Sequence, residues 1–149
     1  MTAKSLIFRA DSAGFSLIEL LMVVTIIGII ASIAVPHLLR SKTAANEAVA
    51  ISYMRSWSAV QELYHTNHGC YADDDNQLFD DGLVGGHDPA NSHGYTFSLD
   101  NQPGSQYTWW GRASPDIPGE TGTTWFYIDQ TGLFRGSTSG AVDSNSPPL

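Results

Sequence analysis

One carboxylate interrupts an otherwise apolar stretch of this 149-residue chain. Glu19 stands near the start of a run that continues to Val35, in which only Thr25, Gly28 and Ser32 are less apolar. A carboxylate near the centre of a membrane-spanning helix costs roughly 2.5–3.5 kcal/mol or more. An acid in this position therefore needs a physical reason. We interpret Glu19 as a group that interacts with a neighbouring copy of the chain; the alternative is an unpaired carboxylate at the edge of a bilayer.

A second group of acids has the chemistry of a calcium site. Asp73, Asp75, Asp80 and Asp81 offer hard oxygen ligands within nine residues. The EF-hand spacing is not met, because no glycine stands at the sixth position counted from Asp73 and no glutamate at the twelfth. We therefore favour a solvated acidic loop without a cofactor, with calcium as the alternative.

A third group combines soft metal ligands. His65, His68 and Cys70 form an H-x-x-H-x-C pattern in which the ligand types suit zinc. Both histidines stand at the expected end of a helix, where a histidine complements the helix dipole without a metal. We favour that interpretation. Because Cys70 is the only cysteine, no disulfide forms within one chain.

A long helix is expected to carry the first of these groups. Residues 17–39 approach the roughly 20 apolar residues that cross a hydrocarbon core. Gly28 and Pro36 are weak points of this helix, and Pro36 predicts a bend. Glycine at position 69 marks the expected end, so the helix has about 52 residues counted from Phe15. Beyond Pro36, apolar residues recur at steps of three and four and predict a face that packs under a globular head: Ala45, Val49, Tyr53, Trp57, Val60 and Tyr64.

The rest of the chain predicts a small antiparallel sheet. Residues 70–94 are expected to be an acidic loop with one short helical turn near 78–84. Alternation with a period of two begins at Tyr95, and turn signals separate the further strands expected at 106–112, 123–129 and 133–137. The expected fold is α+β, with three or four strands in the range 94–137 packed on the helix. Residues 138–149, rich in serine, glycine and proline, are expected to be a loose tail.

Charge and motifs limit the function classes. From Thr66 onward the chain has eleven acids, and its only Lys or Arg residues are Arg112 and Arg135. This charge distribution argues against a basic nucleic-acid footprint spread over the head and leaves only a local basic patch as an alternative, so no direct nucleic-acid binding is expected. No nucleophile elbow, phosphate-binding loop or metal-hydrolase helix occurs, so a non-enzyme is expected.

The segment Gly14-Phe15-Ser16-Leu17-Ile18-Glu19-Leu20 resembles the processing and methylation signature of type IV pilins and type II secretion pseudopilins. A short leader with Lys4 and Arg9 precedes it, and residues 127–135 are similar to the closing hairpin of many pilin-like proteins. The resemblance implies cleavage between Gly14 and Phe15 and methylation of Phe15. It also implies pairing of Glu19 with the amino terminus of an adjacent subunit during assembly.

The resemblance divides the chain into a removed leader (1–14), a hydrophobic helix for membrane insertion and polymerisation (15–39), an amphipathic half (40–68) and a head (69–149). It implies a major or minor pilin, held in the inner membrane as a precursor and then assembled on the cell surface. The implied partners are copies of itself, other pilins, a prepilin peptidase that also methylates, an inner-membrane assembly platform and membrane lipid. The alternatives are a type II secretion pseudopilin in a periplasmic pseudopilus and a membrane-tethered binding module.

Overall fold

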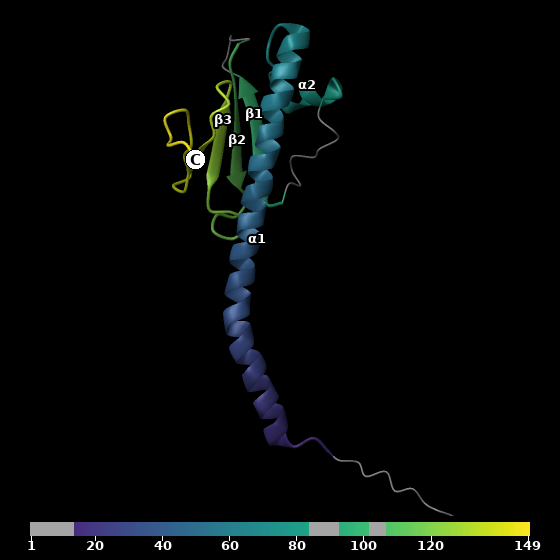
Figure 1. The fold of residues 1–149 in the computed structure, drawn as a ribbon, viewed down its shortest axis with the longest axis vertical. Coiled ribbons are helices and arrows are strands. Elements are labelled where there is room, and N and C mark those ends of the chain that lie inside the picture. Colours follow the sequence, from purple (N-terminus) through teal and green to yellow (C-terminus); the bar gives the residue numbers. More distant parts are fainter. Residues whose placement is uncertain (1–13, 84–92, 102–106) are drawn as a thin grey trace, which may run out of the picture. The chain divides into compact units, whose positions relative to one another are not determined.

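The computed structural model describes residues 14–83, 93–101 and 107–149, and it has the expected α+β class. One long helix and one short helix precede a four-stranded antiparallel sheet (Figure 1). The elements are α1 (Leu17–His68), α2 (Asp75–Asp80), β1 (Tyr95–Asn101), β2 (Trp109–Pro115), β3 (Trp125–Asp129) and β4 (Arg135–Ser137). The chain divides into two compact units, one ending at His37 and one from Leu38 to Leu149, which are described separately below.

Helix α1 is continuous through both of its predicted weak points. Gly28 and Pro36 lie inside the helix, and the Thr25 hydroxyl donates to the Leu21 carbonyl oxygen at 2.7 Å. The bend at Pro36 stays a prediction. The expected end is confirmed, because α1 stops at His68 after 52 residues and Gly69 has a φ of +76°. Glycine adopts that backbone conformation without the steric cost that a side chain adds.

The sheet is a meander in which each strand pairs with the next in sequence. The expected start of the first strand at Tyr95 is confirmed, but the second strand begins at Trp109 rather than at residue 106. Its inward residues include Gly111, where an added Cβ would lie 2.8 Å from Cε3 of Trp57. A small residue is buried at this position because a tryptophan from α1 fills the space above it. A prediction based on alternating large apolar residues does not detect such a position.

The second half of α1 packs on one face of this sheet, within the second unit. The buried core includes Trp57 from the helix, Leu78 from α2, and residues that alternate along the strands. The inward strand residues are Tyr95, Phe97, Leu99, Trp109, Ala113, Phe126 and Ile128. Tyr53 and Trp57 lie at ring-centroid distances of 4.7 and 5.9 Å from Phe97, at edge-on angles that favour aromatic pairs.

The buried face of α1 is rotated relative to the predicted stripe. Ala45 and Val49 are exposed, and the buried positions are Asn46, Ala50, Met54, Trp57 and Gln61. The expectation was wrong for the first two because it counted apolar residues only. Two polar side chains are buried instead, and each has hydrogen-bond partners in the head, which removes most of the cost of burial.

Gln61 shows how this works. Its Nε2 donates to the Ala72 carbonyl oxygen at 3.2 Å, and its Oε1 accepts from the Ala72 amide at 2.9 Å. Asn46 Nδ2 likewise donates to the Thr121 carbonyl oxygen at 2.8 Å. Helix α1 therefore holds the backbone of two segments that have no helix or strand at those points.

The expected position of the short helical turn needs correction. The short helix α2 starts at Asp75, earlier than the turn expected near 78–84, because the Asp74 carboxylate accepts from the Gln77 amide at 3.0 Å and caps it. Residues 84–92, which contain the end of that expected turn, lie outside the described part of the chain.

The expected loose tail is hydrogen-bonded to β4 and to the residue before it. The Gly136 amide donates to the Pro147 carbonyl oxygen at 3.2 Å, and the Leu149 amide donates to that of Phe134 at 3.1 Å. Val142 is buried. The expectation was wrong because an edge strand offers free backbone groups to any nearby segment, whatever its composition.

Candidate functional site

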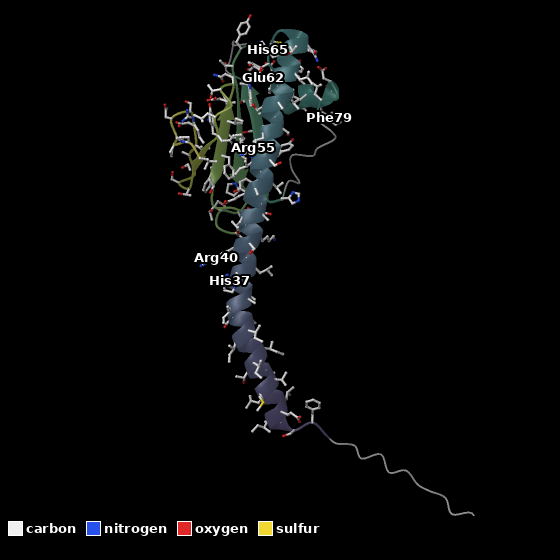
Figure 2. All side chains as sticks on the ribbon, viewed as in Figure 1. His37, Arg40, Arg55, Glu62, His65 and Phe79 are labelled. Carbon is white, nitrogen blue, oxygen red and sulfur yellow. The ribbon has the colours of Figure 1, made fainter. Side chains whose placement is uncertain are left out.

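The apolar part of α1 is exposed along its whole described length. All residues from Gly14 to Lys42 are exposed. Its most apolar 18-residue window has a mean hydropathy of 2.6 and no buried residue. By length and composition this helix is able to cross a membrane. Figure 2 labels His37 and Arg40, which follow the apolar run. So large an exposed apolar surface indicates contact with lipid or with another protein.

Glu19 lies in the first turn of this helix and has a partner within its own chain. The Ser16 amide donates to Oε2 of Glu19 at 3.5 Å, across the helix start at Leu17. Serine followed three residues later by glutamate is the capping-box spacing, and the negative charge also complements the helix dipole. The sequence analysis missed this local signal. At 3.5 Å the hydrogen bond is long, so the carboxylate retains capacity for a second partner.

The residues before the helix are accessible. Phe15 has 81% of its side chain exposed. An added Cβ at Gly14 would meet nothing within 4 Å, and the φ angle of Gly14 is not among the positive ones. Among the described residues, nothing therefore requires glycine at position 14.

Two of the four candidate calcium ligands have partners within the chain. Asp73 accepts a hydrogen bond from the Asn101 side-chain amide, and Asp81 Oδ2 lies 2.8 Å from His68 Nε2. Asp80 is exposed, and the side chain of Asp75 is outside the described set. In the part of the chain that the structure describes, no group of three or more His, Cys, Asp or Glu side chains gathers in a way that could hold a metal ion.

The H-x-x-H-x-C residues have partners of their own. His68 stacks on Tyr64 with ring centroids 4.2 Å apart, besides its contact with Asp81. His65 stacks on Tyr71 at 4.6 Å, and the Tyr71 hydroxyl donates to Oε1 of Glu62 at 2.9 Å. Figure 2 labels Glu62 and His65 on α1 near α2. These contacts join the end of α1 to the chain that follows it.

A further carboxylate, which sequence reasoning missed, ties α1 to the segment between β2 and β3. Oε1 of Glu47 accepts from both the amide and the hydroxyl of Thr123, each at 2.8 Å. Nearby, the Tyr95 hydroxyl donates to the Thr124 carbonyl oxygen at 2.8 Å. Burial, reinforced by the charge of Glu47, raises the pKa of Tyr95 well above its usual range. No local sequence pattern predicts these contacts, because the partners are 29 and 76 residues apart.

Comparison with known proteins adds four findings. Residues 9–35 match the model of the prokaryotic N-terminal methylation motif. The chain is 32% identical to the type IV wide pilus major component PilA4 of Thermus thermophilus, over 92% of this chain and 95% of that protein. It is 31% identical over 48% of its length to the type IV major pilin protein PilA of Myxococcus xanthus, covering 32% of that protein. It is 33% identical over 39% of its length to the type II secretion system core protein G of Pectobacterium carotovorum, covering 37% of that protein.

Proposed function

The chain belongs to the family of type IV pilins and type II secretion pseudopilins, and from this premise we propose that it is a structural subunit of a type IV pilus. One observation carries the choice between the two classes. Similarity to a pilus component extends over 92% of the chain and so includes the head, whereas similarity to the pseudopilin covers only 39%. The head distinguishes the members of such a family, because the apolar helix is common to both classes. A pseudopilin is the second candidate.

We propose that a prepilin peptidase cleaves the precursor after Gly14 and that Phe15 is then methylated on its new amino group. The methylation motif at residues 9–35 supports this. The accessibility of the Phe15 segment supports it too. The described conformation does not itself need glycine at position 14. We therefore propose that the glycine serves the peptidase, which must approach the backbone closely at the cleavage site.

Polymerisation is proposed to occur through the exposed apolar helix. Helices already in lipid associate mainly by packing and by polar contacts, because lipid tails are as apolar as leucine. We propose that Glu19 pairs with the cationic amino terminus of an adjacent subunit. An isolated charge in lipid is expensive, and a paired one is much less so. The pair therefore favours one register of neighbouring helices, as buried polar groups do in coiled coils.

The proposed route begins in the inner membrane. There the precursor spans the bilayer once through α1, contacts lipid, and meets the peptidase and an assembly platform. It ends in a filament with copies of itself and other pilins. In this proposal the chain performs no catalysis. Gly28 and Pro36 are proposed to let the helix bend or loosen on assembly, because each weakens the local helix.

The test is to shear surface filaments from the native host and identify their subunits by mass spectrometry. The expected result is this protein beginning at a methylated Phe15. A protein that still begins at Met1 while the peptidase processes other substrates would contradict the processing proposal. Processed protein that is found only in the cell envelope, and never in sheared filaments, would favour the pseudopilin.

A further inference from the structure

A groove of about 420 Å³ lies on the face of the sheet that does not pack on α1. Ser98 of β1 and Arg112 and Ser114 of β2 line it, and they alternate with the inward-facing core residues. Residues 140–143 of the tail form another part of its lining, together with Trp125 of β3. The groove exists because the tail folds back over the sheet.

Arg112 is at the centre of this face. Its register partners are Ser98 on β1 and Tyr127 on β3, so the three form one row across the sheet. Its guanidinium carbon lies 4.4 Å from the ring centroid of Trp110. Among the described residues, no carboxylate oxygen lies within 4.0 Å of this guanidinium. In a head with eleven acids from Thr66 onward, one of its two arginines is thus held on an aromatic ring without an ionic partner.

The carboxylates near Arg112 are already engaged. Oδ1 of Asp143, in the groove lining, accepts from the Asn145 amide at 2.9 Å and from the Ser146 hydroxyl at 3.2 Å. The Asn145 hydrogen bond is the largest cause of the lowered pKa of Asp143. Asp129 Oδ1 accepts from the Thr131 amide at 2.9 Å. Neither carboxylate forms an ion pair with Arg112 among the described residues, so the guanidinium remains available to an anionic group from outside.

The same face continues into a second hollow of about 310 Å³ on the other side of the Arg112 row. Trp110, Tyr127 and Asp129 line it, and the buried Thr108 hydroxyl in its lining has no hydrogen-bond partner in the described part of the chain. Trp110 and Trp125 are each half-buried, so part of each ring stays accessible. Aromatic faces, hydroxyl groups and the Arg112 guanidinium thus share one face of the sheet, and Arg135 of β4 follows Tyr127 in the same row.

We propose that this face binds a carboxylate-bearing saccharide, with Arg112 paired to the carboxylate of the ligand. A guanidinium binds a carboxylate through two parallel hydrogen bonds, which is stronger and more selective than a point charge. The apolar faces of sugar rings pack on aromatic rings, and the sugar hydroxyls find partners in Ser98 and Ser114. An acidic peptide satisfies Arg112 but leaves the aromatic faces and the hydroxyls less well used. If the chain is a filament subunit, repeated copies of the site strengthen binding to a polysaccharide by multivalency.

The test uses the full-length protein in detergent micelles, titrated with trigalacturonate and followed by tryptophan fluorescence. The expected result is saturable binding that weakens by about tenfold or more in Arg112→Ala. Arg112→Lys, which keeps the charge but loses the fork, is expected to be intermediate. The matched control is Arg55→Ala, because the Arg55 guanidinium also lies over an aromatic ring, 5.4 Å from the Phe134 centroid, but is not part of the groove. It should bind as the parent protein does.

Two further ligands separate the parts of the proposal. Maltotriose, a neutral trisaccharide, should bind at least about tenfold more weakly than trigalacturonate. Triglutamate, which has carboxylates but no sugar rings, should also bind more weakly. The proposal is overturned if trigalacturonate does not saturate, if Arg55→Ala weakens binding as much as Arg112→Ala, or if triglutamate binds as tightly as trigalacturonate. Unchanged thermal unfolding of Arg112→Ala ensures that lost binding reflects the site, and failure here leaves the pilus assignment unaffected.

Discussion

Replacing Glu19 with glutamine separates the helix capping that the structure shows for this side chain from the charge pairing that we propose for it. Glutamine keeps the length of the side chain and an oxygen that accepts from the Ser16 amide, and it fits the capping box as well as glutamate does. It lacks the charge that pairs with the amino terminus of a neighbouring subunit in the proposed assembly. A loss of function in Glu19→Gln therefore reports on the charge rather than on the helix start.

The two roles differ in expected size. The hydrogen bond from Ser16 is long, at 3.5 Å, and glutamine retains it, so the change in helix stability should stay below about 1 kcal/mol. Removing one partner of a pair shielded from water leaves the other charge uncompensated and costs roughly 3–5 kcal/mol. Since each 1.4 kcal/mol is about a factor of ten, incorporation should fall by roughly two to four orders of magnitude.

The assay expresses the variant together with the parent protein. Mass spectrometry then gives the ratio of the two in sheared filaments and in the membrane pool. We expect Glu19→Gln to be depleted from filaments at least about a hundredfold relative to the membrane pool, with Phe15 still at its amino terminus. Ser32→Ala is the matched control in the same exposed helix, because the Ser32 hydroxyl only donates to the Ile29 carbonyl oxygen, and it should incorporate normally. Equal ratios for Glu19→Gln in both pools would refute the charge-pair reasoning and leave the cap as the role of Glu19.

Three other substitutions test the head, each measured by denaturant unfolding of the full-length protein in detergent. Gly111→Ala should destabilise by about 1–3 kcal/mol, because the new Cβ would meet the Trp57 ring at 2.8 Å. Gln61→Leu should cost about 1–3 kcal/mol or more, because it leaves the amide and carbonyl groups of Ala72 unpaired. Burial raises the pKa of Tyr95 above the usual 10.0, so the unfolded chain ionises at lower pH than the folded one. The stability from Tyr95 is therefore complete below pH 10 and falls as the pH rises through the folded pKa, and Tyr95→Phe should flatten that alkaline decline.

Each of these measurements has an outcome that would contradict its reasoning. Gln130→Leu changes an exposed glutamine and should change the free energy of unfolding by no more than about 0.5 kcal/mol. If Gln130→Leu were as destabilising as Gln61→Leu, the loss in Gln61→Leu could not be assigned to the unpaired groups of Ala72. If Tyr95→Phe lost stability at alkaline pH as steeply as the parent protein, Tyr95 would not be the cause of that decline. A Gly111→Ala protein as stable as its parent would show that Trp57 moves aside at little cost.

Local patterns predicted the main elements because their physical causes are local. The length of α1 follows from an unbroken apolar and amphipathic run that ends at Gly69, and the first strand follows from alternation that starts at Tyr95. The capping of α1 by Glu19 was also readable from spacing alone, although the sequence analysis explained that residue only through a partner chain.

Other features could not be predicted because their partners are distant in sequence. Which face of α1 is buried depended on Asn46 and Gln61, whose burial is favourable only because the head supplies Thr121 and Ala72. The packing of β2 on α1 depended on Trp57, whose ring leaves no room for a side chain at Gly111.

The sequence by itself determined an exposed apolar helix with a single acid near its start, and a small antiparallel sheet after it. Hydrophobic periodicity and backbone preferences act over a few residues, so they can be recognised from neighbouring positions in the sequence. Only the tertiary structure decided that the tail returns to β4 and that Arg112 lies on Trp110 in a groove without a carboxylate partner among the described residues. Those outcomes depend on which separate segments meet, and the free energy of a polar or charged group is set by the partners it finds there.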